Sequence, residues 1–322
     1  MIYNIKKFTH ICIVVLSIIT AISFLGSYWW LFDLLSHARI QYLICAILGL
    51  ITILILRTIK REAYENWYIA LCTILILANA HPIASFYFDG NNITHPDESQ
   101  SLLRVMSLNV LKENNQYNKT ISKINNENPD ILLLIEIDNK WLDQMSQIEN
   151  NYPYKITAPS SDSYFGMAMY SKSKFIKQRI EAWGRHKIHY ISASIEDSRK
   201  NTINIVGVHA RPPLTRESAQ DNYNQLEHLI QQASLNPEAV VVMGDFNHTP
   251  WSYRYNALVN KGPLYNVASG AIPYGTWFKQ LLGGILIDHI LVKNLSARDW
   301  HLGSDVGSDH AAVIVDLQTW DH

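Results

Sequence analysis

Hydrophobic residues are concentrated in the first 90 positions of the chain, in three nearly unbroken runs. The runs cover residues 8–32, 40–56 and 67–88. Each approaches or exceeds the roughly 20 residues that a helix needs to cross the hydrocarbon layer of a bilayer. The pattern therefore predicts a membrane domain over residues 1–90 with three transmembrane helices.

Two features of these runs leave alternatives open. Lys6 and Lys7 form a basic start before an apolar stretch, as in a cleaved signal peptide, although the first run is too long for a signal core and two more runs follow. The second run is the shortest, so a re-entrant or tilted segment is an alternative to a spanning helix there.

The distribution of lysine and arginine sets the expected orientation. The chain start and the segment between the second and third runs are basic, whereas Arg39 is the one basic residue between the first two runs and the segment 89–100 has none. Because cytoplasmic loops are enriched in these residues, the N-terminus is expected in the cytoplasm. The C-terminal part then lies across a bacterial-type plasma membrane, in the periplasm or outside the cell.

From about residue 102 onward, short β-rich segments alternate with helical ones. Two segments are predicted to be helices, NKTISKINNEN and TRESAQDNYNQLEHLIQQAS, with Thr215 as the N-cap of the second. Seven segments are predicted to be strands, several of them apolar without alternation and so buried on both faces: LLRVMSLNV, DILLLIEI, FGMAMYS, INIVGVHA, AVVVMGDF, ILIDHILV and AAVIVDL. The pattern predicts one α/β domain over residues 91–322.

Nearly every buried-looking strand ends with a polar residue that is costly to bury and useful at a phosphate. Strand ends on one edge of a sheet face the same crevice, so these side chains are expected to converge there. Gathered carboxylates and amides make an oxygen-rich site suited to Mg²⁺ or Mn²⁺. The residues are Asn109, Glu136, His209, Asp245 with Asn247, Asp288, and Asp309 with His310.

At these residues the sequence resembles the endonuclease/exonuclease/phosphatase superfamily, which includes DNase I, AP endonucleases and neutral sphingomyelinases. Seven short blocks follow the family's order: LNV, IEI, GMAMYSK, VHARPP, GDFNHTP, IDHILV and GSDHAAV. The resemblance implies a DNase I-like, four-layer α/β sandwich behind the three transmembrane helices. It also implies a phosphoric ester hydrolase that depends on a divalent metal.

The resemblance also implies roles for individual residues. Glu136 is similar to the family's main metal carboxylate, with Asn109 and Asp309 completing the shell around Mg²⁺ or Mn²⁺. Asp245 resembles the residue that orients or deprotonates the attacking water, which requires a base within hydrogen-bonding reach. Asn247 resembles the donor to a phosphate oxygen.

The histidines complete the catalytic set that the resemblance implies. His310 resembles a phosphate-contacting histidine, and Asp288 the carboxylate that holds its ring and favours the imidazolium. His209 resembles a second phosphate-facing group. In the same block Ala311 follows His310 where relatives often have an aromatic or basic residue, a departure that concerns specificity.

Three further residues are substrate-binding candidates. Arg211 follows His209 and is able to grip a phosphate in bidentate fashion. Thr276 and Trp277, in PYGTWF, lie in the segment that shapes the substrate pocket in relatives. The alternatives are an exposed arginine and a tryptophan packed in the core.

Charge bears on the substrate. Residues 91–322 carry 21 Lys plus Arg and 24 Asp plus Glu, a net charge of −3. Nucleic acid binding without sequence preference relies on a basic surface, which this composition does not indicate. Nucleic acid is therefore a less favoured partner than a small or lipid-linked phosphoester.

Three spanning helices before an exported domain of this kind resemble the membrane-bound glycopeptide-resistance phosphatases, thought to act on undecaprenyl pyrophosphate. The bilayer is then the first partner, because the tether holds the site where a lipid-linked substrate lies. An extracytoplasmic nuclease and a non-catalytic scaffold of an envelope complex stay open as alternatives. The sequence does not indicate the oligomeric state.

Overall fold

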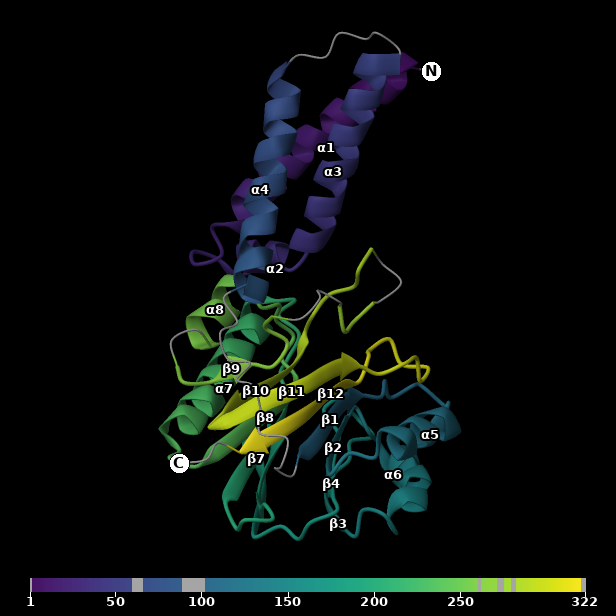
Figure 1. Cartoon of the computed structure of the whole chain (residues 1–322), viewed down its shortest axis with the longest axis vertical. Coiled ribbons are helices and arrows are strands. Elements are labelled where there is room, and N and C mark those ends of the chain that lie inside the picture. The colour runs from purple at the N-terminus through teal and green to yellow at the C-terminus, as the bar shows by residue number, and fades with distance from the viewer. Residues whose placement is uncertain are drawn as a thin grey trace.

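The computed structural model describes residues 2–59, 66–88, 102–259, 262–270, 275–278 and 282–319. A bundle of long helices stands on an α/β domain, and the short helix α2 (Trp30–Ser36) lies at the junction between them (Figure 1). The predicted boundary between the two domains, at residues 90 and 91, lies outside the described residues.

The bundle consists of α1 (Ile2–Ser23), α3 (Arg39–Ile59) and α4 (Asn66–Phe88). All three are long and apolar enough to cross a membrane. The second predicted run forms a continuous helix of 21 residues, so it has the length of a spanning helix. Apolar side chains such as Ile18, Leu48 and Leu77 point outward from the bundle, as expected of a surface that faces lipid.

The first run ends earlier than the sequence predicted. Its helix stops at Ser23, and the last part of the run forms the start of α2 after a turn. Gly26 lies in that turn, where a Cβ would come within 3.0 Å of the Asp33 side chain and 3.1 Å of its Cα. The close approach of the turn to α2 therefore breaks the apolar run into two helices.

The α/β domain contains two six-stranded sheets that pack face to face. The first sheet has the order β11-β12-β1-β2-β4-β3, and the second has the order β5-β6-β7-β8-β10-β9. The strands are β1 (Leu103–Asn109), β2 (Ile131–Ile135), β3 (Tyr154–Ala158), β4 (Met167–Ser171), β5 (Lys177–Trp183), β6 (Ile188–Glu196), β7 (Thr202–His209), β8 (Ala239–Asp245), β9 (Tyr265–Asn266), β10 (Asp288–Lys293), β11 (Leu295–Leu302) and β12 (Val313–Thr319).

Helices cover the outer faces of both sheets. The first sheet packs on α5 (Tyr117–Glu127), α6 (Asn139–Met145) and the 3₁₀ turn η1 (Ser146–Ile148). The second packs on α7 (Arg216–Leu235) and α8 (Tyr253–Val259). A third core of mainly aliphatic and methionine side chains fills the space between the sheets. The predicted four-layer α/β sandwich is confirmed.

The seven predicted strands and both predicted helices are present. Thr215 caps α7, accepting a hydrogen bond from Ser218 N while the Ser218 hydroxyl accepts one from Thr215 N. The prediction missed β3, β5, β6, β9 and β11. Strand β5 shows why. Its residues are mostly exposed and several are charged, so the segment has no clear hydrophobic pattern, and it is a strand because it pairs with β6.

Candidate active site

Two pairs of parallel strands bring the polar strand ends together. Strands β1 and β2 run parallel, so Asn109 at the end of one lies beside the position from which Glu136 leaves the other. Strands β7 and β8 are also parallel, and His209 lies in register with Asp245. Strand β10 runs antiparallel to β8 and begins with Asp288 opposite Asp245. The structure therefore brings these polar strand ends together, and they come from both sheets.

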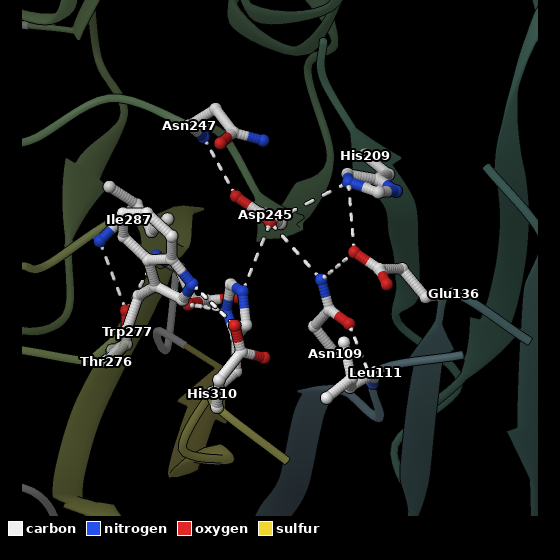
Figure 2. Close-up of polar contacts among 12 residues, drawn as sticks. Asn109, Leu111, Glu136, His209, Asp245, Asn247, Thr276, Trp277, Ile287 and His310 are labelled. Atoms are coloured by element: carbon white, nitrogen blue, oxygen red, sulfur yellow. Dashed lines mark hydrogen bonds and ion pairs between the residues drawn. The ribbon is translucent and has the colours of Figure 1, made fainter. Parts of the chain in front are cut away.

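Asp245 lies at the centre of the cluster (Figure 2). Its Oδ2 is 3.4 Å from Asn109 Nδ2, 3.7 Å from His209 Nε2 and 3.9 Å from His310 Nε2. Its Oδ1 accepts a hydrogen bond from the backbone N–H of Asn247 at 2.9 Å. Burial, followed by the charge of a neighbouring carboxylate, raises the pKa of Asp245 well above its usual range.

Glu136 is presented by a strained backbone position, with φ at 64°. Gly166 O accepts the N–H groups of Glu136 and Ile137, at 2.8 and 3.2 Å, and holds this turn in place. A Cβ on Gly166 would lie 1.8 Å from Ile137 O, so this close approach requires glycine. Asn109 Nδ2 donates to Glu136 Oε1 at 2.8 Å, while burial raises the pKa of the Glu136 carboxyl.

His310 is held as an imidazolium. Its Nδ1 donates to Asp288 Oδ2 at 2.8 Å. Burial favours the neutral ring, but the charge and hydrogen bond of Asp288, together with the charges of Asp245 and Asp309, outweigh it, and the pKa of His310 rises to about 10. Ser308 accepts the His310 backbone N–H and donates to the Asn109 carbonyl, which ties this segment to β1.

The ring of His209, unlike that of His310, is neutral. It is buried, 2 % exposed, and lies against Phe165 with the ring centroids 4.9 Å apart. Burial and then the charge of His310 lower the pKa of His209 to about 3. The site therefore pairs an imidazolium at His310 with a neutral imidazole at His209.

The donor set fits a divalent cation. The carboxylates of Glu136, Asp245, Asp288 and Asp309 converge on one edge of the sandwich, and the His310 imidazolium compensates only part of their charge. Within the described part of the chain, Asp309 Oδ1 is buried and has no hydrogen-bond partner. Buried carboxylates in such number are costly unless paired or bound to metal. Among the described residues, Asp245, Asp288 and His310 also lie as close together as metal ligands, but the His310 imidazolium has no lone pair for a cation, so only the carboxylates of that group are able to bind one.

The other candidates lie around this cluster in different ways. Asn247 has φ at 53°, and its Nδ2 donates to Ala210 O at 2.9 Å. Trp277 Nε1 donates to Asp309 Oδ2 at 2.8 Å, so its indole borders the site. Thr276 is fully buried, and its hydroxyl accepts the N–H groups of Ile287 and Asp288. This hydroxyl therefore holds the start of β10.

Arg211 is not brought to the cluster by any contact of the structure. Its Nη1 lies 2.6 Å from Asp221 Oδ2 and 3.6 Å from Glu217 Oε1, both on α7. A guanidinium held by two carboxylates is partly neutralised before any phosphate arrives. The sequence did not indicate this pairing, because it depends on how α7 packs against the segment that carries Arg211.

Several residues of the site were not singled out from the sequence. Gly166 holds the Glu136 turn, Ser308 joins two strand ends, and Phe165 packs on His209. Gly166 and Ser308 stand inside blocks that were recognised, GMAMYSK and GSDHAAV. Their roles depend on backbone contacts, which leave little trace in a residue pattern.

Solved structures with the same architecture come from several sources. Humanized D. rerio TDP2 superposes with a TM-score of 0.58 at 19% identity, covering 68% of this chain and 99% of that one. The human Nocturnin catalytic domain gives 0.54 at 18% identity, covering 68% and 95%. Sphingomyelinase C from Streptomyces griseocarneus gives 0.51 at 17% identity, covering 67% and 99%. At these identities the likeness establishes the fold.

Sequence comparison establishes the family. None of the curated protein sequences compared matches this chain. The family of endonucleases, exonucleases and phosphatases matches residues 106–310, which extend from β1 to His310 and include all eleven candidate residues. Members of that family are generally metal-dependent phosphoesterases and nucleases. The chain belongs to the endonuclease/exonuclease/phosphatase family.

Proposed function

We propose that this protein is a membrane-anchored, divalent-metal-dependent phosphoesterase that hydrolyses a phosphoester or pyrophosphate bond of a lipid-linked substrate outside the cytoplasm. The observation that carries the lipid-linked substrate is the position of the site next to the bundle. The loop after Asn247 contacts α2, and the segment after Trp277 contacts α3. A lipid phosphate lies at the membrane surface, so anchoring raises its effective concentration at the site.

The residues of the site suit hydrolysis by an attacking water. Asp245 takes a proton from the water, a role for which its raised pKa is suited. Asn247 keeps one amide hydrogen for a phosphate oxygen, because the other is bound by Ala210 O. The His310 imidazolium and the neutral His209 face the negative charge that develops on the phosphoryl oxygens. Glu136, Asn109 and Asp309 would hold Mg²⁺ or Mn²⁺, which supplies positive charge to a phosphoryl oxygen.

The orientation and the lipid substrate belong to this proposal as well. Helix α1 begins and α3 ends at the end of the bundle away from the α/β domain (Figure 1). Lys6 lies near the start of α1 and Arg57 in the last turn of α3, which suits a cytoplasmic N-terminus and a catalytic domain, residues 91–322, on the other side. Residues 1–90 then form the membrane domain. This arrangement supports the proposal that the protein belongs to a membrane-anchored branch of the family that resembles the glycopeptide-resistance phosphatases.

The full chain in lipid nanodiscs tests the activity. We expect Mg²⁺-dependent phosphate release from undecaprenyl pyrophosphate and weak or no nicking of plasmid DNA. Robust nicking without lipid hydrolysis would favour the extracytoplasmic nuclease. Equal signals from the wild type and Asp245→Ala on both substrates would leave the scaffold alternative. A reporter fused to the C-terminus tests the orientation, and reporter activity in the cytoplasm would contradict it.

Trp277→Phe is expected to weaken metal binding without changing the fold. The substitution removes the Nε1 donor to Asp309 Oδ2 and keeps an aromatic ring of similar position. Groups that hold a metal ligand typically contribute about 10- to 100-fold to metal affinity. The Mg²⁺ concentration for half-maximal activity should therefore rise by roughly that order. An unchanged Mg²⁺ dependence would argue against Asp309 as a ligand.

A further inference from the structure

Buried polar groups fill the junction between the bundle and the α/β domain. From the bundle side come Asp33, which is 1% exposed, and His37, which is 7% exposed. From the other side comes the segment of residues 246–254, which follows Asp245, carries Asn247 near its start and ends with the first two residues of α8. This segment is here called the β8–α8 loop. A membrane tether alone requires no such groups, because an apolar seam would suffice.

Asp33 binds the far end of the β8–α8 loop. Its Oδ1 accepts the backbone N–H of Tyr253 at 2.7 Å, and its Oδ2 lies 3.4 Å from the N–H of Arg254. The Arg254 guanidinium, 4.0 Å away, supplies charge of opposite sign. Hydrogen bonds to a buried carboxylate are among the stronger ones in proteins, so this end of the loop is fixed by α2.

His37 binds the middle of the same loop. The backbone N–H of Thr249 donates to His37 Nδ1 at 3.2 Å, and Trp251 Nε1 donates to the His37 carbonyl at 3.4 Å. The His37 ring stacks on His248, with centroids 5.3 Å apart. These contacts begin at His248, one residue after Asn247.

Asp33, His37 and His248 also have the spacing of a metal site. The tautomer of His37 argues against that use. Its Nδ1 already accepts a hydrogen bond, so in the neutral ring the proton sits on Nε2 and leaves no lone pair there for a cation. Burial lowers the pKa of His37 to about 4, which keeps the ring neutral. The contacts therefore serve the loop.

Other segments that border the site rest on the bundle too. Gln41 Nε2 donates to Gly284 O at 2.9 Å, in the stretch that pairs with Trp277. Ser269 donates to the Phe86 carbonyl at 2.7 Å. Trp251 of the β8–α8 loop packs in a small apolar core with residues of α3 and α4. The bundle thus contacts two segments tied to candidate residues, the β8–α8 loop with Asn247 and the stretch that pairs with Trp277.

We propose that Asp33 and His37 are positioning residues of the catalytic site: through the β8–α8 loop they hold Asn247 in place, so the membrane domain is a structural part of the site. This inference rests on the proposed phosphoesterase function for its catalytic half. Its structural half, the fixing of the loop by α2, does not depend on the substrate.

The test compares the full chain and three variants in nanodiscs, well below their melting temperatures. Asp33→Ala removes both acceptors, while Asp33→Asn keeps a side-chain oxygen for the Tyr253 N–H. Asp316→Ala is the matched control, because Asp316 is a buried carboxylate, 7% exposed, that binds Arg104 in the first sheet and has no contact with the loop. Hydrogen–deuterium exchange of residues 246–254 and steady-state kinetics are measured on each.

We expect Asp33→Ala to accelerate exchange in the β8–α8 loop and to lower kcat on the order of 10- to 100-fold, as displaced catalytic groups do. The KM and the Mg²⁺ dependence should stay unchanged, and Asp33→Asn should recover part of the loss. The control should melt earlier with wild-type exchange in the loop and wild-type kcat. Unchanged exchange, or faster exchange with unchanged kcat, would overturn the proposal. A wild type that hydrolyses no phosphoester would instead refute the proposed function, and the catalytic half with it, while exchange still decides whether α2 holds the loop.

Discussion

Asp245→Asn is expected to abolish hydrolysis and, at the same time, to make the metal-free protein more stable. Asparagine cannot take a proton from the attacking water, and loss of a general base typically costs about 10²- to 10⁴-fold in rate. The amide keeps the shape of the side chain and an oxygen for the Asn247 N–H. The effect on kcat is therefore chemical and does not require the loop to move.

The gain in stability follows from the pKa of Asp245. Burial and the charge of Asp288 raise it above the ordinary value of 3.8, so the folded state binds this proton more tightly than the unfolded chain. Without metal, the folded protein loses stability as the pH rises from about 4 through the raised pKa. Asparagine removes that loss. Each kcal/mol of stability regained in this way raises the melting temperature of a domain of this size by about 2–4 °C.

Melting curves with and without Mg²⁺, together with kcat, measure both effects. At pH 8 without metal, the variant should melt a few degrees above the wild type, and excess Mg²⁺ should reduce or reverse the difference. Asp316→Asn should give the opposite pattern, with earlier melting and normal kcat. Asp316 pairs with Arg104 at the other end of β1, away from the site. A variant that melts earlier than the wild type without metal would contradict the assigned charge balance.

The sequence indicated that these side chains converge because Asn109, Glu136 and Asp245 each come at the end of an apolar run. Parallel pairing brings Asn109 beside Glu136 in the first sheet and His209 beside Asp245 in the second, and the packing of the two sheets then joins the two pairs. The catalytic roles of these residues stay predictions.

The same reasoning did not extend to contacts that depend on how two segments pack. It did not indicate that Arg211 pairs with Asp221, which lies only 10 residues further along the chain, in α7. A role of Arg211 in phosphate binding stays a prediction.

The junction could not be predicted for the same reason. Asp33 comes directly after the apolar run of residues 8–32, which was expected to span the membrane, so nothing local indicated a role for this carboxylate in the other domain. The structure shows that α1 ends before it and that its partners are 220 residues away, in the loop after Asn247. Secondary structure follows from periodicity, whereas a contact between domains requires both surfaces.

Asp288→Asn is the second substitution with a large expected effect, because it removes the group that keeps His310 charged. Burial works against the imidazolium, and Asp288, through its charge and its hydrogen bond to Nδ1, makes the largest contribution among the carboxylates that together outweigh burial. Without that carboxylate the pKa of His310 should fall from about 10 towards or below its ordinary value of 6.5. At pH 8 we expect kcat to fall roughly 100-fold or more, as for loss of a positioned acid or charge.

The pH dependence separates this cause from misfolding. In the wild type, the His310 pKa lies above the unfolded value, so its contribution to stability is complete below about pH 6.5 and is lost as the pH rises through about 10. Activity that needs the imidazolium should follow the same alkaline limb. In Asp288→Asn that limb should move to lower pH, with part of the activity recovered near pH 6.

Thr276→Val is the matched control for the position of Asp288. It removes the hydroxyl that accepts the Asp288 N–H but leaves the carboxylate, so it should lower kcat without moving the alkaline limb. A rate profile that falls equally at every pH in Asp288→Asn would mean that the carboxylate only orients the ring. A limb that moves in both variants would mean that the backbone, through Thr276, controls the charge of His310.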